Sequence, residues 1–156
     1  HPFDAARILA TLSDSLLRTA PLEVPLVTQP DHRALRFIDR GWPLPQGSTR
    51  LRAPVAFLIG PDAVSGAETT LAIVEAYRLG TTVGATTAGT NGSANNVSLP
   101  GGYGVRFTGQ RVRKHDGSRF HGVGIPPLVP VQPTLRGLRA GRDEILDRAI
   151  ALLGRS

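Results

Sequence analysis

A short apolar run near the middle of the chain predicts a buried strand. Residues 54–59 read Pro-Val-Ala-Phe-Leu-Ile, and Gly60 and Pro61 end the run. Side chains that are apolar on both faces are typical of a strand inside a parallel sheet, which is covered on both sides. We therefore expect a buried strand here, parallel to its neighbour.

The segment after this run predicts a helix and a second strand. Residues 65–79 carry an apolar stripe at helical spacing, made of Ala67, Leu71, Val74 and Tyr77. Gly80 follows at the position where a helix often ends in a left-handed residue. Residues 81–84 then begin another strand. The order strand, helix, strand predicts a βαβ unit with a right-handed crossover.

Both ends of the chain show the period of an amphipathic helix. Near the start, residues 5–17 carry apolar side chains at helical spacing, and Asp4 can cap that helix. Near the end, residues 143–153 predict a closing helix. The side chains expected to face inward there are Leu146, Ala149, Ile150 and Leu153.

The segments between these elements have weaker patterns. Residues 20–50 are interrupted by prolines and predict an irregular loop, which we expect Trp42 to anchor. Its one extended piece, residues 24–27, contains Pro25, so it is predicted to be an edge strand or no strand. Residues 84–102 predict a long loop, and a loop of that length is often functional.

The region after this loop predicts a hairpin and an extended stretch. Residues 103–108 and 111–113 have the pattern of two paired strands, with a turn at Gly109. Residues 121–127 are rich in glycine and proline and are expected to be extended.

Composition narrows the possible classes of protein. The chain has 156 residues, which fits one domain with its own core, divided into a helix and proline-rich loop (1–50) and a core (51–153). There is no cysteine, which excludes disulfides and thiol catalysis. No stretch approaches the roughly 18 uninterrupted apolar residues of a membrane span. The chain opens without methionine or a leader, which suggests a part of a longer protein.

Charge does not indicate a nucleic-acid partner. The formal net charge is +6, but the arginines are scattered from Arg7 to Arg155 and form no basic stripe. The four histidines are well separated and lack a Glu-x-x-His pairing, so no zinc site is predicted.

Ser65 is the strongest candidate for chemistry. It lies between the predicted strand and helix, where a tight turn would expose its hydroxyl at the carboxyl end of the strand. The helix start supplies free N–H groups, and the N–H of Gly66 is well placed for a developing oxyanion. The alternative is a capping box, because Glu68 follows three residues after Ser65. The two interpretations are compatible.

Several motifs in order resemble the tail-specific (C-terminal processing) protease and tricorn-core serine peptidase family, over residues 51–153. The motifs are Ser65-Gly66-Ala67-Glu68, Thr82-Val83-Gly84, Thr86-Thr87-Ala88-Gly89, Leu99-Pro100-Gly101-Gly102, Asp116-Gly117, Gly122-Val123-Gly124-Ile125-Pro126-Pro127 and Gly141-Arg142-Asp143. The resemblance implies an α/β, ClpP/crotonase-like β/α fold, N-terminally incomplete here, with a C-terminal β-hairpin region and a closing helix.

The same resemblance implies peptide hydrolysis through an acyl-enzyme, with Ser65 as nucleophile and Gly66 as oxyanion donor. It implies no cofactor. It suggests an extracytoplasmic compartment, which the residues themselves do not indicate.

The chain departs from the family at the position of the general base. In the processing-protease branch a lysine ends the Gly-x-x-Thr-x-Gly-Lys segment, and Thr90 occupies its place here. In the tricorn-like branch the base is an upstream histidine, which would fall before residue 1. His121 matches that branch's glutamate. It is predicted to belong to a charge relay, to hold the glycine-rich turn by hydrogen bonds, or to be an exposed bystander.

The loop that begins at Thr90, Asn91 and Gly92 is either a substrate-peptide contact or a polar surface turn. The leading hypothesis is therefore a serine-type peptidase whose base lies outside this chain. The alternatives are a catalytically silent peptide-binding or scaffold module and, less favoured, acyl-CoA chemistry. An uncovered sheet edge and face predict association with the upstream part of the parent chain or with another copy.

Overall fold

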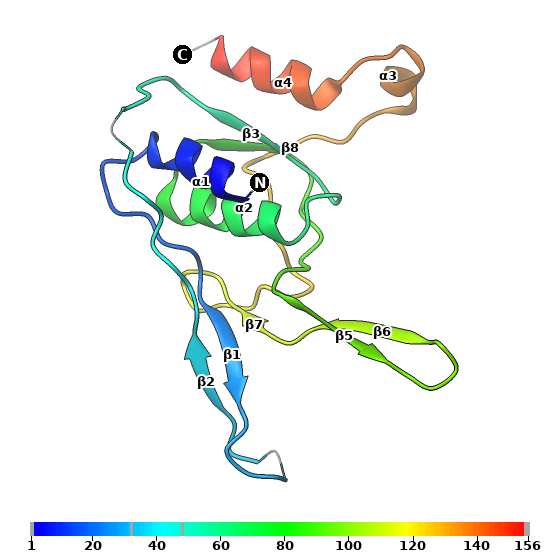
Figure 1. Ribbon diagram of the computed structural model, residues 1–156. Coiled ribbons are helices and arrows are strands. Elements are labelled where there is room, and N and C mark those ends of the chain that lie inside the picture. Colours follow the sequence, from blue (N-terminus) through cyan, green and yellow to red (C-terminus); the bar gives the residue numbers. More distant parts are fainter. Residues whose placement is uncertain (1, 32, 48, 155–156) are drawn as a thin grey trace.

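The structure is a computed structural model that describes residues 2–31, 33–47 and 49–154. Four helices are present in this part of the chain: α1 (Pro2–Ala10), α2 (Gly66–Tyr77), α3 (Leu135–Arg139) and α4 (Glu144–Leu153). The strands are β1 (Leu22–Leu26), β2 (Arg36–Asp39), β3 (Ala56–Ile59), β4 (Thr81–Gly84), β5 (Ala94–Ser98), β6 (Gly104–Thr108), β7 (Arg111–Val112) and β8 (Val129–Pro130). They form a mixed α/β arrangement of three small sheets (Figure 1).

The central sheet contains the predicted βαβ unit. Its strand order is β3-β4-β8, and both pairs are parallel. The parallel pairing of β3 with β4 and the intervening helix α2 are confirmed. The prediction that β3 is buried on both faces is wrong, because Ile59 is 4% exposed but Leu58 is 46% exposed. Because neighbouring side chains alternate between the faces of a strand, the face that carries Leu58 is not fully covered by the described residues.

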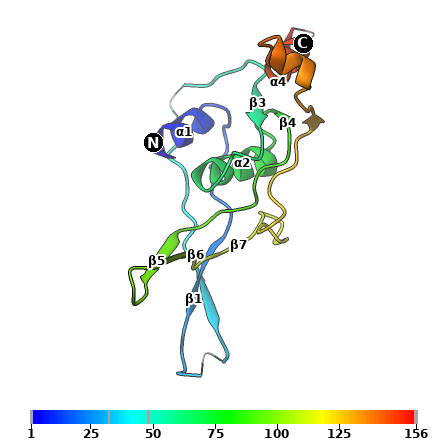
Figure 2. The ribbon, with the colours of Figure 1, turned by 90° about the vertical axis from the view of Figure 1, so that its right-hand side faces the viewer.

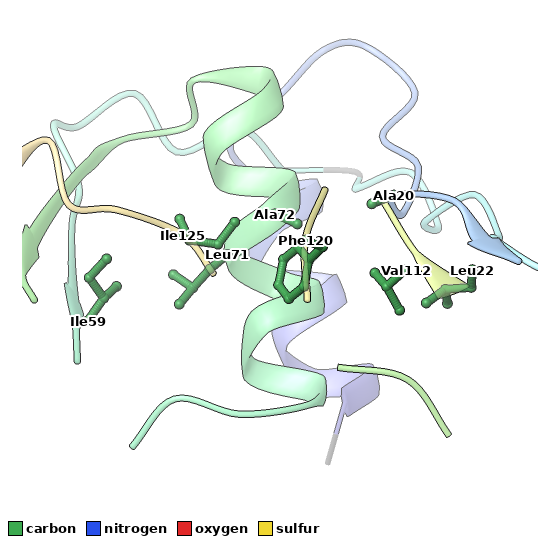
Figure 3. Packing of buried hydrophobic residues seen from close by; sticks show 8 residues of the cluster. All are labelled: Ala20, Leu22, Ile59, Leu71, Ala72, Val112, Phe120 and Ile125. Atoms are coloured by element: carbon green, nitrogen blue, oxygen red, sulfur yellow. The ribbon is translucent and has the colours of Figure 1, made fainter. Parts of the chain in front are cut away.

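The main core joins this sheet to the β2-β1-β7 sheet. Figure 3 shows the cluster around α2, whose side chains lie between β3 and the segments that carry Val112 and Phe120. Its buried members are Ala20, Leu22, Ile59, Leu71, Ala72, Val112, Phe120 and Ile125. A second cluster packs α1 against α2 and includes Leu9, Leu12, Leu17, Leu44, Ile73 and Val74. Helix α2 is thus held from two sides, which fixes the position of its first residue.

Helix α1 is shorter than predicted. It ends at Ala10, and Asp4 lies inside it rather than at its cap. Leu9 is buried, as the helical spacing predicts, but Leu16 lies outside the helix and is exposed. The polar side chains after Ala10 bond to nearby main chain, for example the Thr11 hydroxyl to the Ile8 carbonyl. Such local bonds compete with helix continuation.

The region predicted to be irregular between residues 20 and 50 contains a hairpin. Strand β1 pairs with β2 on one side and, over its first two residues, with β7 on the other. Pro25 lies beyond the part that β7 reaches, so β1 is an edge at this residue, as predicted. Trp42 is pinned through its main chain, which exchanges bonds with Thr19, whereas its side chain is 46% exposed.

The prediction that residues 103–108 pair with residues 111–113 in a hairpin is wrong. Strand β6 pairs with β5, which lies in the predicted loop 84–102, and β7 pairs with β1 instead. The two Asn residues of β5 weaken its strand pattern, because asparagine is depleted in strands. Residues 121–123 form turns rather than an extended stretch.

No helix of the described residues is long and apolar enough to cross a membrane.

Helix α4 begins where predicted. The side chain of Asp143 accepts bonds from the N–H groups of Ile145 and Leu146. Of the four side chains predicted to face inward, Ala149 is buried, whereas Leu146, Ile150 and Leu153 are 43%, 60% and 38% exposed. These three side chains leave one face of α4 apolar and open.

The end of α2 also differs from the prediction. The left-handed residue is Arg78, with φ 53° and ψ 47°, rather than Gly80. A Cβ at Gly80 would lie 2.5 Å from the Val55 carbonyl oxygen, so glycine is required there by the close approach of the chain.

Arg78→Gly is expected to raise the free energy of unfolding by about 1 kcal/mol, because a side chain in the left-handed region is strained. Urea denaturation of the two proteins measures this difference. Arg78→Ala is the matched control, since alanine keeps the strain. Equal stability of the glycine and alanine variants would contradict the expectation.

Glu23 contributes stability that depends on pH. The hydrogen bond from Arg111 lowers the pKa of Glu23 below its ordinary value of 4.5, while desolvation acts against it and Arg113 adds a second contact. A lowered pKa in the folded state gives stability that is present above pH 4.5 and is lost as the pH falls through the folded value. Glu23→Gln is thus expected to destabilise the protein more at pH 7 than at pH 3, as denaturation midpoints would show. The same loss at both pH values would rule this out.

Candidate active site

Ser65 occupies a strained position immediately before α2. Its backbone has φ 52° and ψ −115°, a region that residues with a side chain rarely adopt. The Ser65 N–H donates to the Thr90 carbonyl at 2.8 Å, and its own carbonyl accepts from the Thr69 N–H at 3.0 Å. The hydroxyl makes no cap bond to the helix, so the capping-box interpretation is wrong. The main chain holds Ser65 in place and leaves its Oγ available.

Gly66 is the first residue of α2. An N–H at this position has no acceptor one turn earlier in the helix, and it carries part of the positive end of the helix dipole. A Cβ at Gly66 would meet nothing within 4 Å, so the space beside this residue is open. The N–H is therefore suited to receive an anionic oxygen.

Glu68, the expected partner in the capping box, has a different role. The residue is fully buried, at 0% exposure. One carboxylate oxygen accepts from the Thr87 hydroxyl and from the Gly89 N–H, both at 2.6 Å, and the other accepts from the Thr90 N–H at 2.9 Å. Glu68 thus fixes the loop whose Thr90 carbonyl in turn holds Ser65.

Sequence reasoning missed this role of Glu68. The spacing of Ser65 and Glu68 marks a helix start, but it does not show that the glutamate points away from that start. Only the fold places the 87–90 loop against α2. The available signal is a lone carboxylate on the otherwise apolar, inward side of a predicted helix.

Asn91 continues the same polar network. It is 4% exposed, its Nδ2 donates to the Thr69 hydroxyl at 3.0 Å, and its Oδ1 accepts from the Gly92 N–H at 2.7 Å. Gly92 has φ 106°, and a Cβ there would lie 2.7 Å from a Thr108 methyl group. These contacts fix the segment that leads from the Ser65 loop toward β5.

A cavity of about 550 Å³ opens beside Ser65. Its lining is mostly apolar, with Arg40 as its charged side chain among the described residues. The lining residues are Ala6, Leu22, Arg40, Trp42, Pro43, Pro45, Ser65, Gly66, Thr69, Asn91, Gly92, Ser93 and Gln110. The structure therefore brings Ser65, Gly66, Asn91 and Gly92 together. Thr90 meets Ser65 through its main chain instead.

His121 does not belong to the lining of this cavity. Its Nε2 accepts from the Val112 N–H at 2.9 Å, and its ring meets the Phe120 ring edge-on. The bond occupies the lone pair of Nε2, so this nitrogen cannot take a proton from Ser65 in this arrangement. The contacts are those of a residue that holds a turn against β7.

The lining of the cavity supplies no carboxylate, imidazole or amine that could accept the Ser65 proton, within the described residues. No group of three or more metal-ligating side chains gathers in this part of the chain either. The arrangement thus offers a serine hydroxyl without a cap bond beside a main-chain N–H donor at a helix start.

The profile of peptidase family S41 matches residues 19–131 of this chain. The chain belongs to peptidase family S41. The match includes Ser65, Gly66, Glu68 and the 87–90 loop, so the resemblance seen in the motifs is confirmed. A search of curated proteins finds no match.

Solved structures of peptidases share the fold of this S41 chain. A candidate peptidase from Parabacteroides merdae has a TM-score of 0.81 at 23% identity, over 98% of this chain and 48% of that one. The CPAF s499a mutant has a TM-score of 0.76 at 17% identity, over 97% of this chain and 40% of that one. The photosystem II D1 C-terminal processing protease has a TM-score of 0.59 at 19% identity, over 85% of this chain and 32% of that one. The S41 chain thus spans about half or less of the length of these proteins.

Proposed function

We propose that this chain carries the nucleophile of a serine-type peptidase, and that Ser65 attacks the substrate carbonyl. The observation that carries the proposal is the strained Ser65, whose hydroxyl is free of cap bonds beside a cavity. A strained backbone conformation persists only where the surrounding structure holds it in place, and such conformations are concentrated at functional sites. The family assignment supports peptide-bond hydrolysis as the reaction.

In the proposed mechanism Oγ of Ser65 forms a bond to the scissile carbonyl carbon while a base takes its proton. The carbonyl oxygen becomes negative and accepts the Gly66 N–H. As the tetrahedral intermediate collapses, the base gives this proton to the nitrogen, the carbon–nitrogen bond breaks, and the amine leaves. Water then hydrolyses the ester and restores Ser65.

The base is proposed to lie outside residues 1–156. Thr90 cannot serve, because a threonine hydroxyl is not a base near neutral pH, and His121 has its Nε2 bonded to Val112. We propose the structural role for His121 among its three interpretations. The upstream part of the parent chain, or another copy, would supply the base and complete the ClpP/crotonase-like fold. An extracytoplasmic location stays a prediction from the family.

Asn91 and Gly92 are proposed to contact the substrate peptide, since both line the cavity with Ser65. Thr90 is proposed to act from behind, through the carbonyl that accepts the Ser65 N–H. A silent binding module is the less favoured alternative, because it would not require a strained serine with a free hydroxyl.

Fluorophosphonate labelling tests the proposal, applied to residues 1–156 alone and to a longer chain that contains them. Intact mass and peptide mapping are expected to find the adduct on Ser65 of the longer chain only. Adduct on both would place the base within these residues. No adduct on either would overturn the peptidase assignment of Ser65 and favour the silent module.

A further inference from the structure

The β5–β6 hairpin projects from the body of the molecule, directly beside the proposed active site. Figures 1 and 2 show it extending away from α1 and α2. Every residue of both strands is exposed. Yet the hairpin starts at the cavity, because Asn91, Gly92 and Ser93 line it and β5 begins at the next residue, Ala94.

One edge of β5 has no partner among the described residues, since β5 and β6 form a two-stranded sheet. The direction of its main-chain groups follows from two bonds. The Gly109 N–H donates to the Ser93 carbonyl at 3.4 Å, and the Leu99 N–H donates to the Tyr103 carbonyl at 2.7 Å. The main-chain N–H and C=O groups of Ser93 and Leu99 therefore point toward β6.

Because main-chain groups alternate along a strand, Asn95 and Val97 also point toward β6. The N–H and C=O groups of Ala94, Asn96 and Ser98 then point to the open edge. An extended chain laid along this edge would meet three donors and three acceptors at the spacing of a sheet.

This edge lacks the features that normally prevent pairing. Natural edge strands are protected by charged side chains, proline or bulges. Strand β5 reads Ala-Asn-Asn-Val-Ser, without a charge or a proline, and its register with β6 runs without a bulge. An unprotected edge at a proposed peptidase site fits a surface that adds a strand.

The hairpin also has one apolar face. The register places Val97 opposite Val105 and Asn95 opposite Phe107, so these side chains share a face. Val97, Val105 and Phe107 are 44%, 45% and 49% exposed. A strand added to β5 would place every second side chain beside Val97 on this face.

We propose that the open edge of β5 binds an extended substrate peptide by adding it to the sheet, with apolar side chains preferred at every second position. The inference rests on the proposed function, since the peptide's scissile bond would lie at Ser65. The occupant is a peptide because β5 begins at the rim of the cavity, so that a strand paired with it leads into the cavity. Such binding uses the main chain for affinity and alternate side chains for specificity.

The test measures peptide binding by fluorescence anisotropy, on the full-length protein carrying Ser65→Ala. The probe is a fluorescein-labelled decapeptide in which valine alternates with serine, flanked by lysines. Asn96→Pro removes the outward N–H without removing a bond to β6, and it is expected to weaken binding about 3- to 10-fold, the effect of one hydrogen bond. Asn96→Ala keeps that N–H and is expected to change binding less than about twofold.

A second measurement leaves the protein unchanged and methylates the peptide nitrogens one at a time. Binding is expected to weaken with a period of two residues, because alternate N–H groups face β5. Equal effects of the Asn96 variants, no period in the methylation series, or a change in oligomeric state instead of affinity would overturn the inference. The last outcome would make a second copy the occupant.

Labelling with a small fluorophosphonate separates this inference from the proposed function. The probe does not extend along β5, so labelling of the unaltered protein reports on Ser65 independently of the β5 edge. If the unaltered protein is not labelled at all, the proposed function fails, while the anisotropy series still decides whether β5 binds a peptide.

Discussion

Ser65→Ala is expected to lower peptide hydrolysis by the full-length protein at least about 10⁴-fold, because it removes the proposed nucleophile and with it the proposed acyl-enzyme. The residual rate would come from binding and from the Gly66 N–H alone. Initial rates with a quenched fluorescent peptide measure the loss.

Ser93→Ala is the matched control, since Ser93 lines the same cavity without the strained backbone of Ser65. It is expected to change the rate less than about tenfold. Hydrolysis that survives Ser65→Ala at near its original rate would show that another group is the nucleophile, whatever happens at Ser93.

Glu68→Gln is expected to lower both stability and the rate of labelling at Ser65. The carboxylate is fully buried and accepts three bonds, from Thr87, Gly89 and Thr90. An amide has one oxygen, so at least one of these donors would face an NH₂ group. Leaving a buried donor unpaired costs about 1–3 kcal/mol, and more where the lost partner was charged. Urea denaturation measures this cost.

The labelling rate tests whether the effect reaches the active site. Thr90 links the Glu68 carboxylate to the Ser65 N–H, so a loosened loop is expected to release Ser65 from its strained conformation. Glu75→Gln is the matched control on the same helix, because Glu75 is partly exposed and bonds to Lys114. Labelling of folded Glu68→Gln at the original rate would show that Glu68 stabilises the fold without positioning Ser65.

The sequence by itself determined the elements in which neighbouring residues decide the structure. The apolar run before Gly60 gave β3, the helical spacing after Ser65 gave α2, and Asp143 marked the start of α4. For α2 and α4 the signal and the hydrogen bonds that it predicts lie within a few residues of one another. For β3 only the signal, a continuous apolar run, is local, since the strand pairs with the distant β4. The motif order also indicated the peptidase family, since it records the order of these local units.

Tertiary structure alone decided the contacts between distant segments. The partner of β6 is β5 rather than the segment after Gly109. The sequence did not predict this pairing, because the polar residues of β5 give no local strand pattern. The role of Glu68 likewise depends on a loop about twenty residues away. Periodicity reports only which side of an element is buried and not what lies against it, so the network that holds Ser65 and the open edge of β5 emerge only when the chain is folded.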